Sequence, residues 1–226
     1  MTATPTFEPS PLLQAVALAG ERGGRPLFAA LDFTLHPGQV TWLRGRNGRG
    51  KTSLLRLLAG LATPAAGAVH CAGRPLKQAG NGWRERLVYI GHPNALKEDL
   101  SVAESLRFLA QVQGRSPTPA DIAMALGLLG MAALAGRPVR TLSQGQRRRV
   151  ALARLALPQP RSVWLLDEPY DALDDDGVQR LNTLLGEHAR AGGSALLTSH
   201  QSPGLQDPMP GMLNLDDAGA RHARAA

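Results

Sequence analysis

The sequence feature that most constrains this chain is the stretch GRNGRGKT at residues 45–52. It follows an apolar run at residues 40–43 and precedes a helical pattern at residues 54–58, and this context favours a phosphate-binding loop over an ordinary glycine-rich turn. Glycines tolerate the positive φ angles that turn successive backbone N–H groups toward an anion. The dipole of the following helix favours negative charge at the same place. The stretch therefore predicts a nucleoside triphosphate site.

Consecutive residues of this segment are candidate nucleotide ligands. They are Gly45, Arg46, Asn47, Gly48, Arg49, Gly50, Lys51, Thr52 and Ser53. Lys51 has the length to reach the β- and γ-phosphates, and the hydroxyl of Thr52 is a suitable Mg²⁺ ligand. We therefore expect Mg²⁺ to bind together with the nucleotide.

Acidic residues follow a later apolar segment. Residues 163–166 (VWLL) form an uninterrupted apolar run, which is typical of a buried parallel strand, and Asp167 and Glu168 come directly after it. In open parallel sheets, ligands bind beyond the carboxyl ends of the strands. Asp167 is therefore a candidate Mg²⁺ ligand, and Glu168 is a candidate general base for the attacking water. The alternative for this pair is a solvated, charge-rich strand end.

A histidine, His200, follows the next predicted strand at residues 194–198. The carboxyl end of that strand lies at the same edge of the sheet, so the imidazole would reach the γ-phosphate and stabilise the charge that develops on it. Taken alone, His200 is more often an ordinary loop histidine.

The order of the predicted elements favours an α/β fold. Apolar segments at residues 12–18 and 27–35, with Gly23 and Gly24 between them, predict an antiparallel β-hairpin layer ahead of the nucleotide strand. Residues 77–84 are polar, and we expect a loop there.

A helical pattern then interrupts the α/β order. Ser101 and Thr118 stand at positions typical of helix N-caps, each followed at the third position by an acidic residue. The predicted boundaries are about 10–92 and 141–216 for the core and about 93–140 for an inserted α-helical subdomain, all within a single domain, residues 1–226.

The formal net charge is +7 and the pI about 10.6, and such values also occur in proteins that bind nucleic acid. The basic residues are mostly arginines scattered along the chain, and the one dense run, RRR at residues 147–149, falls on a predicted helix whose successive side chains point in different directions. A basic balance equally suits a membrane surface or an acidic partner. Charge alone therefore does not decide between these partners.

The sequence has no bilayer-spanning apolar stretch and no secretory signal pattern, so we expect the chain to stay in the cytoplasm. The chain has a single cysteine, Cys71, so it cannot form an internal disulfide, and no other metal-binding residues accompany Cys71 at metal-site spacing.

Residues 142–146 (LSQGQ) complete an ordered set of motifs that is similar to the nucleotide-binding subunits of ATP-binding cassette (ABC) transporters. The glycine-rich loop resembles their Walker A motif and residues 163–168 (VWLLDE) their Walker B motif. LSQGQ resembles their signature motif, residues 172–174 (ALD) their D-loop, and His200 their switch histidine. The resemblance covers nearly the whole chain. It implies the P-loop NTPase fold of ABC ATPases, with ATP and Mg²⁺ as ligands.

The resemblance also implies a homodimer, because in this family the signature motif of one subunit completes the nucleotide pocket of the other. The residues that would contact this nucleotide are Ser143, Gln144, Gly145, Gln146 and Asp174. Gln144 stands where the family commonly has glycine or alanine, at a position that points away from the phosphate. The family also stacks adenine on an aromatic residue near the first strand, and residues 17–25 contain none, so adenine would be held weakly or by another group.

Several longer stretches, among them YIGHPNALKEDLSVAESLRF, look like one branch of the family, which serves cytochrome c maturation and is described as a heme exporter. His92 belongs to this likeness, because most ABC ATPases have glutamine there. The branch implies that His92 touches Mg²⁺ or the attacking water; a heme ligand and a tolerated strand-end histidine are the alternatives. It further implies integral membrane transporter subunits of the cytochrome c maturation system as partners, at the cytoplasmic face of the bacterial inner membrane.

Two other functions stay open at this point. The chain could serve a different cargo as an ABC ATPase, since cargo contacts lie on membrane subunits. A soluble ABC-type ATPase acting on nucleic acid or the ribosome would be expected to have two cassettes in one chain, or a coiled-coil or zinc insertion, and this sequence has neither. We therefore expect no nucleic acid partner.

Overall fold

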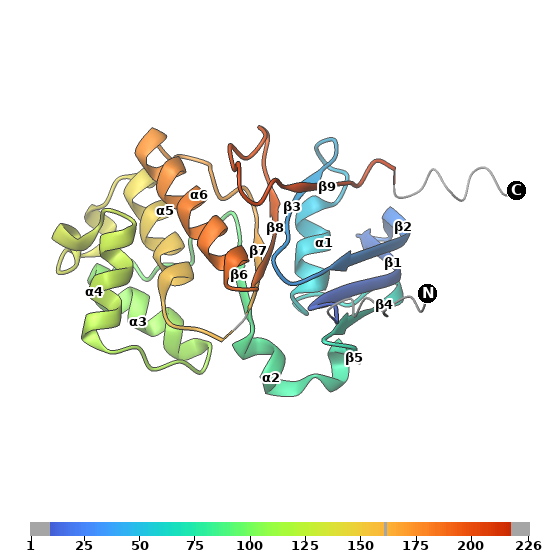
Figure 1. Cartoon of the computed structure of the whole chain (residues 1–226), viewed down its shortest axis with the longest axis horizontal. Coiled ribbons are helices and arrows are strands. Elements are labelled where there is room, and N and C mark those ends of the chain that lie inside the picture. The colour runs from blue at the N-terminus through green and yellow to red at the C-terminus, as the bar shows by residue number, and fades with distance from the viewer. Residues whose placement is uncertain (1–9, 161, 218–226) are drawn as a thin grey trace, which may run out of the picture.

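The computed structural model describes residues 10–160 and 162–217, so the ends of the predicted domain, residues 1–9 and 218–226, lie outside the described residues. Two sheets and a group of helices lie side by side in it (Figure 1). The first sheet is antiparallel and has the strand order β2-β1-β4-β5. Its strands are β1 (Leu13–Arg22), β2 (Arg25–Leu35), β4 (Ala66–Cys71) and β5 (Arg74–Pro75). The predicted β-hairpin layer is therefore confirmed.

The second sheet is parallel and has the order β6-β7-β8-β3-β9. Its strands are β3 (Val40–Arg44), β6 (Leu87–Ile90), β7 (Val163–Leu166), β8 (Ser194–Thr198) and β9 (Gly211–Asn214). Side chains alternate between its two faces. In β7, Val163 and Leu165 pack in the apolar cluster that includes helix α1 (Lys51–Leu58) and the antiparallel sheet. Trp164 and Leu166 pack in the opposite cluster, with α5 (Gln144–Leu152) and α6 (Asp175–Arg190).

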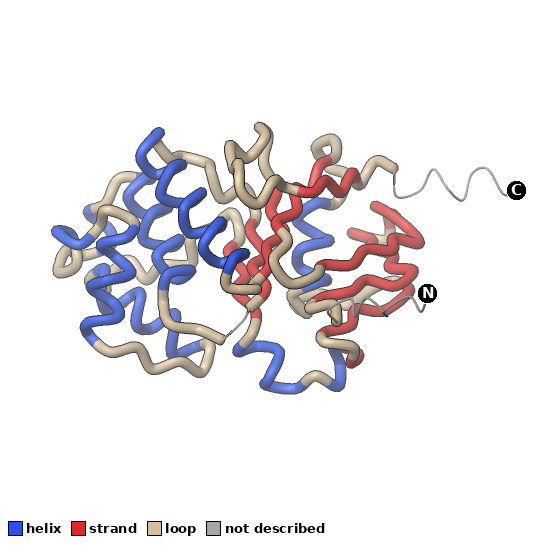
Figure 2. Tube along the Cα trace, in the orientation of Figure 1, coloured by secondary structure: helices blue, strands red, loops and turns tan. Residues whose placement is uncertain are grey.

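Helices dominate the chain between β6 and β7 and gather away from the strands (Figure 2). Helix α3 (Val102–Val112) begins at Ser101 and α4 (Pro119–Leu128) at Thr118, each with the reciprocal hydrogen bonds of a capping box. The apolar cluster on this side of the parallel sheet continues into these helices without a break. Residues 93–140 are thus packed on the same core as the sheet, and their treatment as a separate subdomain stays a prediction.

The prediction of a loop at residues 77–84 is wrong. A 3-10 turn at Leu76–Gln78 leads into a short helix, α2 (Gly80–Glu85). Its first residues have low helix propensity, which explains why the local sequence does not reveal it. The indole of Trp83 is buried in the cluster beneath the antiparallel sheet, and this tertiary contact outweighs the poor local propensity.

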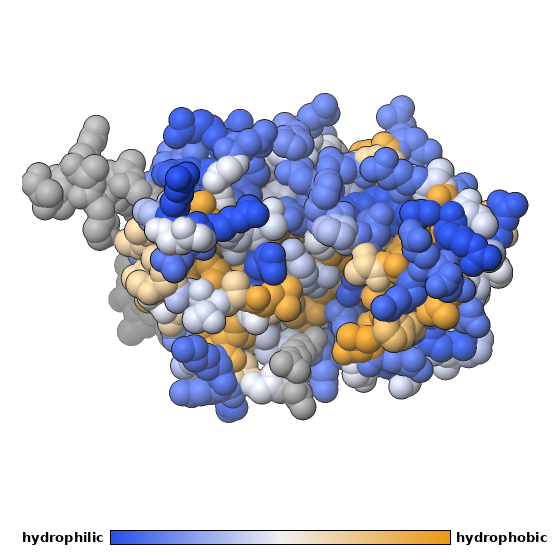
Figure 3. Space-filling view, turned by 180° about the vertical axis from the view of Figure 1, so that it is seen from behind, coloured by the Kyte–Doolittle hydropathy of each residue, from blue (hydrophilic) through white to orange (hydrophobic). Residues whose placement is uncertain are grey.

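Within residues 10–160 and 162–217, no helix combines the length and the apolar character needed to cross a bilayer. Figure 3 shows the face opposite to that of Figure 1, where apolar areas alternate with polar ones.

Candidate active site

The glycine-rich loop connects β3 to α1, at the carboxyl end of the parallel sheet. Gly45, Gly48 and Gly50 all have positive φ, at 149°, 78° and 102°. Gly50 is the N-cap of α1, and a Cβ there would lie 3.0 Å from the Cβ of Leu27, so both the backbone angle and the space call for glycine. The Nζ of Lys51 donates a hydrogen bond to the carbonyl of Gly45 at 2.7 Å and thus lies along the loop.

Predicted residues that follow the four parallel strands β3, β6, β7 and β8 meet in one cleft of about 330 Å³. Its lining consists of Arg22, Leu27, Arg46, Asn47, Gly48, Gly50, Lys51, Thr52, Ser53, His92, Asp167, Glu168 and His200. Gly45 and Arg49 are not part of this lining. The guanidinium of Arg49 instead lies 3.4 Å from the carboxylate of Asp216, which also accepts a hydrogen bond from the backbone N–H of Arg46 at 3.1 Å.

Asp167 lies directly after β7 and is only 3% exposed. Its Oδ1 accepts a hydrogen bond of 3.0 Å from the hydroxyl of Thr198, at the end of the neighbouring strand β8. The same hydroxyl oxygen accepts the backbone N–H of Glu168 at 2.7 Å. Thr198 therefore fixes both acidic residues.

The donor set around Asp167 fits Mg²⁺. The hydroxyl of Thr52 and the carboxylate of Asp167 line the same cleft and are hard oxygen ligands. Mg²⁺ commonly takes one or two protein oxygens and completes its shell with water and phosphate oxygens, so two protein ligands suffice.

Glu168 has an unusual backbone and an unusual environment. Its φ is 48°, in the left-handed region that non-glycine residues rarely adopt, and its side chain is 13% exposed. Burial raises the pKa of its carboxyl group; Asp171 and Asp167 raise this pKa further, whereas His200 and Lys51 oppose the shift. The Nε2 of His200 lies 3.9 Å from Oε1 of Glu168. A partly desolvated carboxylate with a raised pKa is suited to accepting a proton from water.

His92 follows β6 and faces the cleft from a more open position. Its side chain is 71% exposed, and its Nδ1 lies 3.7 Å from a carboxylate oxygen of Asp171. Among the described residues, no group of three or more histidine, cysteine or acidic side chains forms a cage that would hold a metal by itself.

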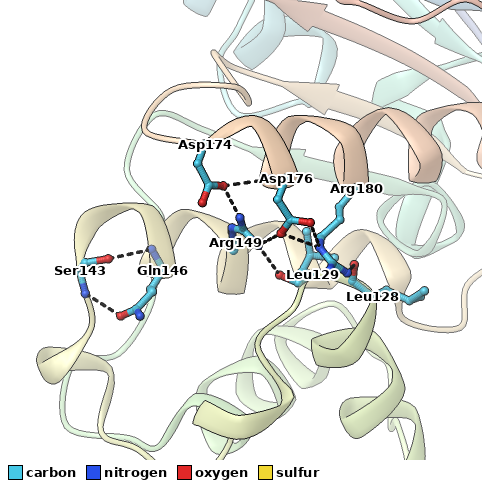
Figure 4. A network of polar contacts seen from close by, with 9 residues as sticks. Leu128, Leu129, Ser143, Gln146, Arg149, Asp174, Asp176 and Arg180 are labelled. Carbon is cyan, nitrogen blue, oxygen red and sulfur yellow. Dashed lines mark hydrogen bonds and ion pairs between the residues drawn. The ribbon is translucent and has the colours of Figure 1, made fainter.

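Most of the LSQGQ residues line a different cavity, of about 360 Å³, together with Asp174. Ser143 is the N-cap of α5: its hydroxyl accepts the N–H of Gln146 at 3.2 Å, and its own N–H donates to Oε1 of Gln146 at 3.0 Å (Figure 4). Gly145 also lines this cavity, whereas Gln144 is exposed outside its lining.

Asp174 is the N-cap of α6, where Oδ1 accepts the N–H of Gly177 at 3.0 Å. The same carboxylate is paired with the guanidinium of Arg149, which also donates to Asp176 at 2.6 Å (Figure 4). In this chain the predicted D-loop residue is thus held by an intramolecular ion pair.

A family model described as ABC transporter matches residues 28–171. The chain belongs to the ABC transporter family. It is 46% identical to the cytochrome c biogenesis ATP-binding export protein CcmA of Cupriavidus pinatubonensis, over 84% of this chain and 84% of that protein. The identity to the CcmA protein of Pseudomonas aeruginosa is also 46%, over 86% of this chain and 96% of that protein.

Solved ABC structures share this fold. An ABC transporter ATP-binding protein from Pyrococcus furiosus superposes with a TM-score of 0.77 at 23% identity, over 92% of this chain and 98% of that one. A dimeric ATP-binding cassette in a post-hydrolysis state with ADP and Pi gives a TM-score of 0.73 at 19% identity, over 84% and 88%. The predicted fold class, a P-loop ABC ATPase core with an antiparallel β layer and inserted helices, is confirmed.

Two residues that contact the ABC motifs escaped the sequence analysis as site residues. Thr198 is an ordinary strand residue in the sequence, and only the parallel pairing of β7 with β8 brings it to Asp167. Arg148 appears in the sequence as part of a charge run. In the fold its guanidinium is buried against the backbone that carries Glu168. The polar character of Thr198 at a strand end was the one signal available beforehand.

Proposed function

We propose that this ABC-family chain is the ATP-hydrolysing subunit of a transporter complex in c-type cytochrome biogenesis. The observation that carries the proposal is the single cleft in which the glycine-rich loop meets Asp167, Glu168 and His200. The relatives are named cytochrome c biogenesis ATP-binding export proteins, and these names support the assignment to c-type cytochrome biogenesis. Heme export and release of a heme-loaded chaperone both fit this assignment.

The residues of the cleft divide the chemistry among themselves. The loop N–H groups and Lys51 bind the phosphates. Thr52 and Asp167 would hold Mg²⁺, which would supply positive charge beside the phosphates. Glu168 accepts a proton from the water that attacks the γ-phosphorus, and the bond from this phosphorus to the β–γ bridging oxygen breaks. His200 donates a hydrogen bond to a γ-phosphate oxygen as charge develops.

The cavity at Ser143 supports a homodimer. The start of α5 offers the unpaired N–H groups of a helix N-terminus, and Ser143 and Gln144 are exposed, so a second chain can approach them. Ser143 and the N–H of Gly145 would then contact the γ-phosphate of ATP held by the other chain. A twofold arrangement satisfies both sites with identical subunits.

A groove of about 550 Å³ adjoins the cleft and supports a membrane partner. It is lined by the apolar side chains of Leu61, Tyr89 and Pro93, together with His92 and Arg154. A partner segment in this groove would touch His92 and so respond to the state of the nucleotide. We place the chain on the cytoplasmic face of the inner membrane, bound through this partner. His92 is assigned to Mg²⁺ or the attacking water.

A nucleic acid partner is not favoured. Arg148 and Arg149 of the basic run are buried, and Arg147 is paired with Glu98 at 3.2 Å, so these arginines do not form an open basic surface. An ABC ATPase for a different cargo remains the second candidate, because the residues of the cleft bind the nucleotide and do not contact the cargo.

ATP hydrolysis by the purified chain, with and without RNA, tests the activity, and affinity purification from membranes tests the partner. We expect hydrolysis that RNA does not stimulate, together with co-purification of integral membrane proteins of cytochrome c maturation. Absence of ATP hydrolysis would refute the enzyme assignment. Recovery of unrelated membrane proteins would favour the different cargo.

A further inference from the structure

Arg148 is the most extensively hydrogen-bonded buried cation in the part of the chain described here. It lies in the second turn of α5 and is 3% exposed. Its guanidinium donates to the carbonyl oxygens of Gly91 (3.0 Å), Asp167 (2.9 Å), Glu168 (2.7 Å) and Pro169 (3.3 Å) and to Oδ1 of Asn94 (3.1 Å). These acceptors come from the loops that follow β6 and β7, so one side chain connects both strand ends to α5.

The backbone of Glu168 is held from both sides. Thr198 accepts its N–H at 2.7 Å, and Arg148 donates to its carbonyl at 2.7 Å. A φ of 48° is rare for a residue with a side chain and persists only where the surroundings impose it. The planar fork of arginine can satisfy several carbonyls at fixed positions, which a lysine ammonium cannot reproduce in the same geometry.

The rest of the segment from Asp167 to Asp176 also rests on α5. A Cβ on Gly145 would lie 2.7 Å from the carbonyl oxygen of Ala172, so the helix start and the middle of the segment are in direct contact. Arg149 holds Asp174 and Asp176 at the far end (Figure 4). The segment is therefore attached to the first turns of α5 at three places.

We propose that Arg148 is a positioning residue for ATP hydrolysis: it holds the backbone of Glu168 so that the carboxylate stands over the γ-phosphate. The inference rests on the proposed function, in which Glu168 is the base. Helix α5 would therefore have two roles: its start at Ser143 would contact the ATP bound by the second chain, and its Arg148 positions Glu168 in the nucleotide cleft of the first chain.

The test compares Arg148→Met and Arg148→Lys with Arg147→Met in the full-length chain. Arg147 is the matched control because it precedes Arg148 on the same helix and pairs with the exposed Glu98. ATP affinity from nucleotide titration should stay near the wild-type value in all three variants, because none of the hydrogen bonds of Arg148 described above goes to the glycine-rich loop. The kcat of Arg148→Met should fall about 10²-fold, as expected for a misplaced catalytic group, and Arg148→Lys should recover part of it. Arg147→Met should keep the wild-type kcat.

A double-mutant cycle separates positioning from a general structural role. Combined with Glu168→Gln, Arg148→Met should lower kcat little further, because its effect acts through the carboxylate that is already lost. A full additional loss, or a loss of ATP affinity equal to that of kcat, would overturn the inference. Circular dichroism verifies folding, and if Arg148→Met does not fold, Arg148→Lys decides in its place, with wild-type kcat as the refuting result.

Failure of this inference is distinct from failure of the proposed function. A wild-type chain without ATPase activity, or a fully active Glu168→Gln variant, would refute the proposed function. An active wild type, an inactive Glu168→Gln and a fully active, folded Arg148→Met would refute only the role of Arg148.

Discussion

Replacing His188 with a side chain that does not titrate should make the free energy of unfolding of this chain less sensitive to acid. His188 lies on α6 with its ring stacked on Trp164, at a centroid distance of 3.7 Å and an interplanar angle of 7°. Its Nε2 lies 3.0 Å from the carbonyl oxygen of Ser162. Burial lowers the pKa of His188 from 6.5 to about 4, although hydrogen bonds with the backbone at Ser162 and Ser194 oppose the shift.

The direction follows from comparing the folded and unfolded chains. The unfolded chain binds a proton at the usual pKa of 6.5 and the folded chain only near 4, so stability is complete above about pH 6.5 and is lost as the pH falls toward 4. From this pKa difference we expect the titration of His188 to lower the free energy of unfolding by about 2 kcal/mol when the pH falls from 7 to 5. The loss should reach roughly 3 kcal/mol at pH 4.

The assay is urea denaturation followed by circular dichroism at a series of pH values, for the wild type, His188→Phe and His188→Gln. The phenylalanine keeps an aromatic ring against Trp164, the glutamine keeps a hydrogen-bond donor, and neither titrates. The carboxylates, including those of Asp174 and Asp176, titrate in all three proteins, so their contribution cancels in the difference. Equal pH slopes for the wild type and both variants would show that His188 does not titrate as its burial requires.

The remaining predictions concern the nucleotide cleft. Lys51→Ala should weaken ATP binding by about tenfold or more, as expected when a charge-assisted hydrogen bond is removed, and unchanged affinity in a nucleotide titration would contradict its role. Glu168→Gln should keep ATP affinity and lower the single-turnover rate by about 10²–10⁴-fold; normal turnover would exclude it as the base. Gly50→Ala should lower the free energy of unfolding by about 1–3 kcal/mol, because the new Cβ would combine an unfavourable φ with a close contact to Leu27. Gly48 also has a positive φ, but a Cβ there would have no neighbour within 4 Å, so Gly48→Ala should lower the free energy of unfolding less than Gly50→Ala. Equal losses in thermal denaturation would argue against the contact with Leu27.

Helix starts could be predicted from the sequence because their signals are local. Ser101, Thr118 and Ser143 each have a capping partner three positions further along the chain, and in the structure each forms a capping box. The glycine-rich loop is equally local, since its glycines, lysine and helix follow one another directly. At α2 no such local signal exists, because the interaction that stabilises the helix is the long-range burial of Trp83, and the prediction of a loop there failed.

The cleft could be assembled in outline from one topological rule, because its polar residues follow parallel strands and those strands end at the same edge. The contacts that hold these residues in place could not be predicted. Thr198 meets Asp167 across 31 positions of sequence, and Arg148 meets Gly91 across 57. The sequence marks neither pair, and both depend on strand order and helix packing.

The basic run at residues 147–149 illustrates how a single sequence signal separates into three physical roles. Successive residues of a helix are about 100° apart, so the three side chains leave α5 in different directions. Arg147 reaches Glu98 near the surface, Arg148 turns inward to backbone carbonyls, and Arg149 reaches Asp174 and Asp176. A charge that is buried among fixed acceptors contributes to local geometry far more than to long-range attraction, because its field is compensated at short range. The same lysine substitution should therefore have little effect on the exposed pair of Arg147, whereas at Arg148 it should disturb the backbone that carries Glu168.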